Sequence, residues 1–93
     1  MKYFNFFLMI AVWSCTGNTQ IGDDYFEQGA YDEAIIAYSD YLSGHKPTVT
    51  VLYQRGRSFE EIGEYKHALV DFEKILELDK KNIIAQTSIA KVK

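Results

Sequence analysis

The sequence predicts an all-α fold, a short solenoid of antiparallel helix pairs with about five helices, preceded by an N-terminal signal segment. When the chain is shifted by 34 residues, its second half aligns with its first, and Gly22, Gly29, Tyr31 and Ala34 meet identical residues. Apolar residues recur with the period of an α-helix in both halves. With 47% hydrophobic and 25% charged residues, the composition is that of one small globular domain. These observations indicate stacked helical units that each need a neighbour to bury an apolar face.

The second helix of each unit has the clearest apolar stripe. Its apolar residues recur at positions i, i+3, i+4, i+7, i+10 and i+11, so they share one helix face, which must contact a core. The members of this stripe are Tyr31, Ala34, Ile35, Tyr38, Tyr41 and Leu42 in the first unit and Tyr65, Ala68, Leu69, Phe72, Ile75 and Leu76 in the second.

Turn and capping residues separate the predicted helices. Gly29 and Gly63 stand where each first helix should end, because glycine readily takes the left-handed conformation that closes a helix. Thr48 or Thr50 can cap the helix that follows the first unit, and Asn82 can cap a last short helix over residues 83–92. The chain is therefore expected to turn tightly between helices.

The small and aromatic positions resemble the tetratricopeptide repeat, which has Leu-Gly and then Tyr in its first helix and Ala followed four places later by an aromatic residue in its second. Gly and Ala let two helix backbones approach, and the ring fills the space beside them. The matching packing residues are Gly22, Tyr25, Ala34 and Tyr38 in the first unit and Gly56, Phe59, Ala68 and Phe72 in the second. The alternative is a generic pair of helical hairpins.

The resemblance spans about residues 16–93 and divides the chain into units. The first unit covers residues 15–47, the second covers residues 48–81, and residues 82–93 form a partial third repeat or a capping helix. One departure from the motif is Arg55, which replaces the Leu before the glycine.

Residues 1–14 are interpreted as a signal peptide of the bacterial lipoprotein type. Lys2 is followed by an unbroken apolar run over residues 6–13, which is too short to span a bilayer. Val12, Trp13 and Ser14 then precede Cys15 and resemble a lipobox, in which the cysteine becomes the lipidated first residue of the mature protein. We therefore expect a lipoprotein anchored in the membrane of a bacterial cell envelope, on its periplasmic or surface side. The alternative is an uncleaved anchor or a buried helix.

The sequence predicts no enzyme, metal site or cofactor. The net charge of −3 disfavours nucleic acid as a partner. No phosphate-binding glycine loop or nucleophile motif is present. Runs of carboxylates at helical spacing are interpreted as solvated faces, and His45 and His67 are expected at the surface.

The resemblance implies that the first helices line a concave surface that binds a peptide or a partner helix. The residues placed there by the repeat are Asp23, Phe26, Glu27, Tyr53, Gln54, Arg57, Glu60 and Glu61. Phe26 and Tyr53 can serve either partner contact or packing between helices. A clamp for a terminal carboxylate is not expected, because Thr19 and Asp23 stand where it needs Lys and Asn.

The expected function is a non-catalytic protein–protein interaction module with a protein or peptide partner. The alternative is a structural or assembly component that self-associates into a homo-oligomer or completes the helical array of another chain. The shortness of the array motivates this alternative, because at least three repeats are usually needed for stability. A fragment of a longer array is a further possibility.

Overall fold

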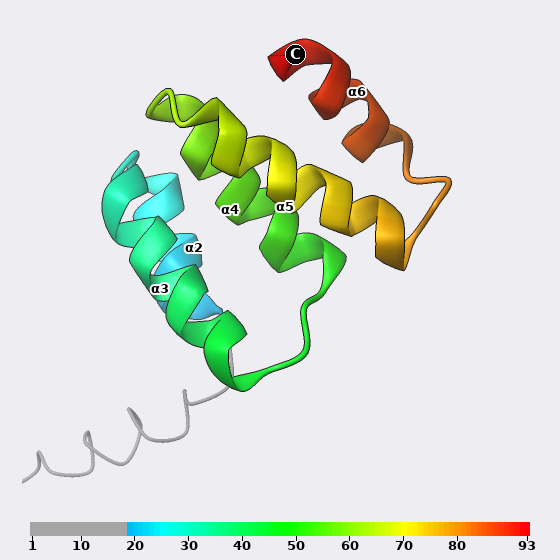
Figure 1. The fold of residues 1–93 in the computed structure, drawn as a ribbon. Coiled ribbons are helices and arrows are strands. Elements are labelled where there is room, and N and C mark those ends of the chain that lie inside the picture. Colours follow the sequence, from blue (N-terminus) through cyan, green and yellow to red (C-terminus); the bar gives the residue numbers. More distant parts are fainter. Residues whose placement is uncertain (1–18) are drawn as a thin grey trace, which may run out of the picture.

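The computed structural model describes residues 19–93, so the expected signal peptide and Cys15 lie outside the described residues. All regular secondary structure among residues 19–93 is α-helix, which confirms the predicted all-α solenoid (Figure 1). Each helix packs on the next in the chain, and α2 also contacts α4. The helices are α2 (Gln20–Glu27), α3 (Tyr31–Gly44), α4 (Val49–Glu61), α5 (Tyr65–Leu78) and α6 (Ile83–Val92).

The two helical hairpins turn at glycines, as predicted. Gly29 and Gly63 have φ angles of 79° and 83°, in the left-handed region that only glycine adopts without strain. In the first turn the amide of Ala30 donates to the carbonyl of Tyr25 at 2.9 Å, and in the second the amide of Glu64 donates to the carbonyl of Phe59 at 2.9 Å. The same backbone geometry therefore closes α2 and α4 and directs α3 and α5 back along them.

Side-chain caps define the starts of α4 and α6. Oγ1 of Thr48 accepts a hydrogen bond from the amide of Val51 at 3.3 Å, and Oδ1 of Asn82 accepts one from the amide of Ala85 at 2.8 Å. These bonds satisfy amides that have no partner within their own helix. Of the two threonines expected to cap α4, the structure uses Thr48.

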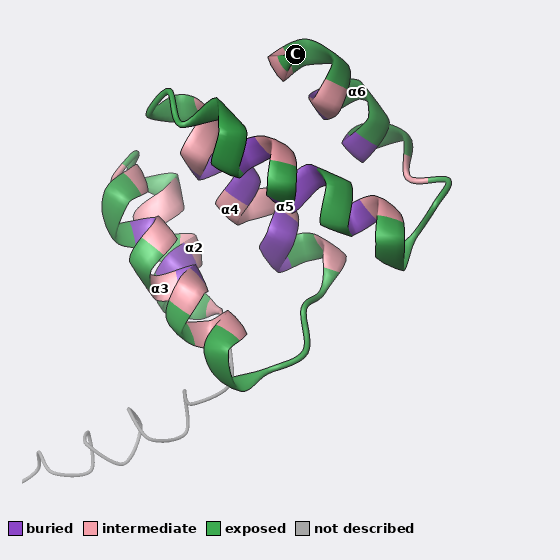
Figure 2. Cartoon of the chain, viewed as in Figure 1, coloured by how far each residue is buried: buried purple, intermediate pink, exposed green. Residues whose placement is uncertain are grey.

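The core of each hairpin is a ring packed on a glycine. A Cβ atom added to Gly22 would lie 2.6 Å from Cε1 of Tyr38, and one added to Gly56 would lie 2.6 Å from Cε1 of Phe72. Ala34 and Ala68 are fully buried, and Figure 2 shows the buried residues along the surfaces where the helices face each other. Close backbone approach, with a ring beside it, thus positions the helices in both units.

The stripe prediction is wrong at one position, because Tyr65 is 54% exposed. Its counterpart in the first unit, Tyr31, is half-buried and packs on the ring of Phe26. The residue one period after Phe26 is Glu60, so α4 offers Tyr65 no matching ring. The remaining stripe residues of α5 are buried or half-buried.

The last helix, α6, covers the open side of the second hairpin. It packs on α5 and contributes Ala85 to the core that contains Leu52 and Phe72. Gln86 and Ala90, one period after the buried Leu52 and Gly56, are exposed. The outer side of α6 therefore has no helix packed against it among residues 19–93. Within that range, no helix has the length and apolar character that crossing a membrane requires.

Candidate interaction surface

A cleft between α4 and α6 brings together three of the predicted partner-binding residues. Its volume is about 270 Å³. α4 supplies Tyr53, Arg57 and Glu60, and the residues supplied by α6 are Ile83, Ile84, Thr87, Ser88 and Lys91. We call this hollow the α4–α6 cleft.

One end of the α4–α6 cleft is apolar. Ile83 and Ile84 are 72% and 58% exposed, which is unusual for large aliphatic side chains side by side on one helix. Tyr53 is half-buried, and its ring centroid lies 6.1 Å from that of Phe72. Tyr53 thus packs against the core, which is one of the two roles expected for it, and also lines the cleft.

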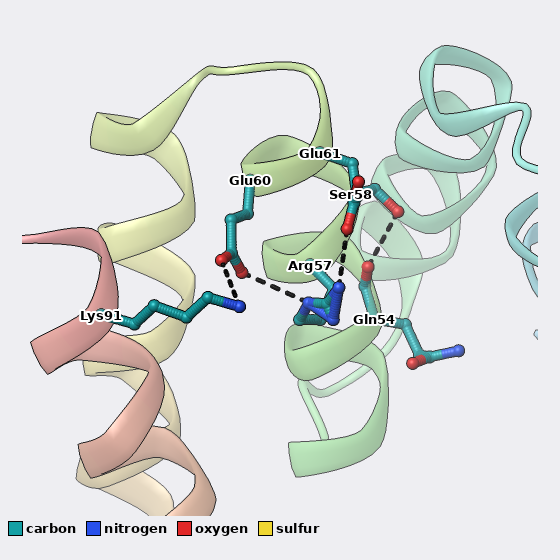
Figure 3. Close-up of polar contacts among 6 residues, drawn as sticks. All are labelled: Gln54, Arg57, Ser58, Glu60, Glu61 and Lys91. Atoms are coloured by element: carbon teal, nitrogen blue, oxygen red, sulfur yellow. Dashed lines mark hydrogen bonds and ion pairs between the residues drawn. The ribbon is translucent and has the colours of Figure 1, made fainter.

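The other end of the α4–α6 cleft is charged (Figure 3). Arg57 donates from Nη2 to Oε2 of Glu61 at 2.7 Å and from Nε to Oε1 of Glu60 at 3.2 Å. From α6, Nζ of Lys91 lies 3.2 Å from Oε2 of Glu60. Since the Glu60 side chain is 10% exposed and the Lys91 side chain is 66% exposed, the charge most accessible to a partner is the ammonium of Lys91.

The carboxylates around Arg57 also keep its guanidinium charged. Burial by itself lowers the pKa of Arg57, but the hydrogen bond to Glu61 and the negative charge of Glu60 outweigh it, so the pKa is raised. Arg57 therefore stays positively charged and holds the side chains of Glu60 and Glu61, which follow it three and four residues later in α4.

The predicted residues on α2 do not line this cleft. Asp23 accepts hydrogen bonds from the Tyr38 hydroxyl at 2.5 Å and from Oγ1 of Thr19 at 3.1 Å. Phe26 packs edge-on against Tyr31, with 5.6 Å between the ring centroids. Glu27 is exposed at the end of α2. Of the three predicted residues on α2, therefore, Asp23 and Phe26 contact α3, and Glu27 is exposed.

The contact with Asp23 changes the acidity of Tyr38. Burial raises the pKa of Tyr38, and the hydrogen bond that its hydroxyl donates to the Asp23 carboxylate raises the pKa further. The neutral phenol is thus favoured in the folded protein.

The last two predicted positions, Gln54 and Glu61, flank the cleft. The backbone carbonyl of Gln54 accepts a hydrogen bond from Oγ of the buried Ser58 at 2.8 Å (Figure 3). Glu61 is exposed and lines an adjoining hollow with Tyr65 and Lys93. Glu60 belongs to both hollows, so the charged end of the α4–α6 cleft continues toward the start of α5.

The prediction from the sequence missed the contribution of α6 to the cleft. A signal was available in the 34-residue period, because Ile84 and Thr87 occupy the positions of Thr50 and Tyr53 in the next unit, and Lys91 occupies that of Arg57. The partial third unit thus extends the surface that α4 forms.

A buried ion pair that the sequence did not predict fixes α4 relative to its neighbours. Arg55 donates from Nε and Nη2 to the two carboxylate oxygens of Asp71 at 2.9 and 2.7 Å. Its Nη1 donates to Oγ of Ser39 on α3 at 3.0 Å. The only hint in the sequence is that Arg55 departs from the repeat motif. This side chain joins the first unit to the second.

Within residues 19–93, no group of three or more His, Cys, Asp or Glu side chains is arranged to hold a metal ion. His45 is exposed and stacks on Tyr41 with 4.2 Å between ring centroids. His67 is exposed, with Nε2 3.9 Å from Oε1 of Glu64. Both histidines thus lie at the surface beside a side chain of their own hairpin.

A family model described as the tetratricopeptide repeat matches residues 49–82, which contain α4, α5 and the turn that leads to α6. No curated protein matches the sequence. The first unit, outside the matched residues, has the same glycine turn and the same contact between ring and glycine. The fold is a solenoid of the tetratricopeptide type, an architecture of non-catalytic scaffolds for protein–protein interaction.

Proposed function

We propose that this protein is a non-catalytic interaction module that binds a protein or peptide partner in the α4–α6 cleft. The observation that carries the proposal is the pair of exposed isoleucines, Ile83 and Ile84, at one end of the cleft and the accessible ammonium of Lys91 at its other end. Exposed aliphatic surface rimmed by polar groups is typical of interaction sites. A partner segment with an apolar side chain for one end and a carboxylate or carbonyl oxygen for the other fits this arrangement.

Two exposed aliphatic residues offer a matched test of the cleft. Ile84 lies in the cleft and is 58% exposed, whereas Val70 lies on α5, lines none of the hollows described above and is 59% exposed. Replacing either with Glu introduces a charge at equal exposure. We expect Ile84→Glu to weaken partner binding by about thirtyfold, the loss typical of a central contact, and Val70→Glu to leave it unchanged.

Affinity capture with the full chain and both variants, followed by quantification of the bound proteins, measures this difference. Circular dichroism establishes that both variants are folded. If Ile84→Glu retains the partners of the parent protein, or if both variants lose them equally, the α4–α6 cleft is not the binding site.

We also propose that the module is anchored in a bacterial envelope through lipid on Cys15. The support is the order of Lys2, the apolar run of residues 6–13, and Ser14 before the single cysteine. Expression of the full chain in a bacterium fed labelled palmitate should label the parent protein and not Cys15→Ala. Equal labelling of the two would contradict lipidation. Because one acyl chain binds membranes only marginally, stable retention requires more than one.

A further inference from the structure

Charged residues are segregated along the solenoid. Residues 20–44, which form α2 and α3, contain six carboxylates and no Lys or Arg. Residues 80–93, which include α6, contain four lysines and no carboxylate. Figure 1 shows α2 and α3 at one end of the array and α6 at the other. We call residues 20–44 the acidic end and residues 80–93 the basic end.

The charges at the two ends are largely unpaired within the described chain. At the acidic end, Glu27, Asp32 and Glu33 are exposed and form no ion pair with another residue in the range 19–93. At the basic end, Lys80 and Lys81 are exposed and equally without an ion pair in that range. The fold therefore keeps a negative and a positive surface apart instead of neutralising one with the other.

Each end also presents aliphatic surface among its charges. Ile21 and Ile36 at the acidic end are 58% and 63% exposed. At the basic end Ile83 and Ile84 are 72% and 58% exposed. Apolar side chains that share a surface with charges of one sign suit a contact with apolar side chains that share a surface with charges of the other sign.

We propose that copies of this protein associate head to tail, with the acidic end of one copy against the basic end of the next. Contact between two acidic ends or between two basic ends brings like charges together and is disfavoured, whereas contact between opposite ends pairs carboxylates with lysines. Because a head-to-tail contact uses two different surfaces, each dimer keeps one free end of each kind and can extend. The occupant of each end is thus a second copy of the chain, whether or not the α4–α6 cleft holds a partner.

Charge reversal at each end tests the proposal without disturbing the fold. Glu27 is the last residue of α2 and Asp40 lies late in α3, so Lys at either position is favourable to the helix dipole. Lys80 and Lys81 precede α6, where Glu is favourable for the same reason. The Glu27→Lys/Asp40→Lys variant leaves four carboxylates and two lysines at the acidic end, and the Lys80→Glu/Lys81→Glu variant leaves two lysines and two carboxylates at the basic end, so each variant weakens the charge of one end and keeps the other end unchanged.

Association is measured by analytical ultracentrifugation of the full chain in a nonionic detergent over a range of concentrations. We expect the parent protein to self-associate at about 50 mM salt and to dissociate at about 500 mM, because screening shortens the range of exposed charges. Each variant alone should associate roughly tenfold more weakly than the parent. An equimolar mixture should recover association, because the unchanged basic end of the first variant can contact the unchanged acidic end of the second.

The mixture separates a specific contact between ends from a general loss of stability, since two damaged proteins would not restore each other. Absence of recovery in the mixture would overturn the proposal. A parent protein that is monomeric at all concentrations would also overturn it and would leave the charged ends to a different partner. Association of equal strength at low and high salt would overturn it as well.

Discussion

The two helical hairpins share a backbone arrangement but differ in the side chains that hold it. In both, a ring lies so close to a glycine that an added Cβ atom would be 2.6 Å from the ring. In the first hairpin the ring is Tyr38, and its hydroxyl is bonded to Asp23. In the second the ring is Phe72, which has no polar atom, and the polar link is the pair of Arg55 with Asp71.

The period makes this difference explicit. One period before Arg55 and Asp71 stand Ile21 and Ala37, so the first hairpin has an apolar pair where the second has an ion pair. In both units the contact between ring and glycine sets the distance between the helices. The polar link differs between the two units in its position and in the residues that form it. Arg55 also reaches Ser39, so the ion pair joins the two hairpins as well as α4 and α5. We infer that small residues determine the repeat geometry and that polar links stabilise it locally.

The largest effect is expected from breaking the ion pair. Asp71→Ala leaves Arg55 without its bidentate partner, and hydrogen bonds to charged groups contribute about 1.5–3 kcal/mol, so we expect a loss of about 2–3 kcal/mol in the free energy of unfolding. The double variant Arg55→Ile/Asp71→Ala installs the apolar pair of the first hairpin. It should be more stable than Asp71→Ala, because no unpaired charge remains.

Urea unfolding followed by circular dichroism measures both variants. The exposed Glu73→Ala on the same helix serves as a control for changes in α5 that do not touch the pair. If the double variant is less stable than Asp71→Ala, an apolar pair cannot replace the ion pair, and the two hairpins are not equivalent at this position.

Much of the fold was predictable because it depends on local chemistry. Gly29 and Gly63 marked the turns, since few other residues accept a positive φ, and Asn82 marked the start of α6 through its capping side chain. Tyr65 was wrongly assigned to the core, because a stripe on one helix does not reveal which side chain of the neighbouring helix meets it, and α4 has Glu60 where α2 has Phe26.

The candidate site was predicted in part, and the missing part depends on contacts between distant residues. Tyr53, Arg57 and Glu60 follow from the period, which assigns them to the concave side. That Lys91 reaches Glu60 requires the angle at which α6 crosses α4, and this angle results from packing of the whole array. In the same way, Asp23 was interpreted as a surface acid because a sequence does not show that the hydroxyl of Tyr38 points at it.

An intermediate effect is expected from Gly56→Ala. The new Cβ atom would overlap the fully buried ring of Phe72, and overpacking of this kind typically costs about 1–3 kcal/mol. Alanine favours the helix over glycine by about 1 kcal/mol, so we expect a net loss of up to about 2 kcal/mol.

Gly44→Ala is the control, because a Cβ atom there meets nothing within 4 Å, although Gly44 ends α3 and so gains less from helix propensity than a residue in the interior. Thermal unfolding should therefore give a lower midpoint for Gly56→Ala and an unchanged or higher midpoint for Gly44→Ala. A higher midpoint for both would show that the ring moves aside and that close approach at glycine does not set the geometry.

The smallest effect is expected from Tyr38→Phe, which gives the first hairpin the ring of the second. Asp23 loses the hydroxyl but keeps its bond from Thr19, so we expect a loss of about 1 kcal/mol at neutral pH.

The pH dependence of the stability of Tyr38→Phe is more informative. Because the pKa of Tyr38 is raised in the folded protein above the unfolded value of about 10, its neutral form contributes stability below that pH, and this contribution is lost as the pH rises further. The parent should lose stability above about pH 10 more steeply than Tyr38→Phe, in urea unfolding at several alkaline pH values. The other tyrosines are common to both proteins, so parallel curves would mean that the contact between Tyr38 and Asp23 does not hold the phenol neutral.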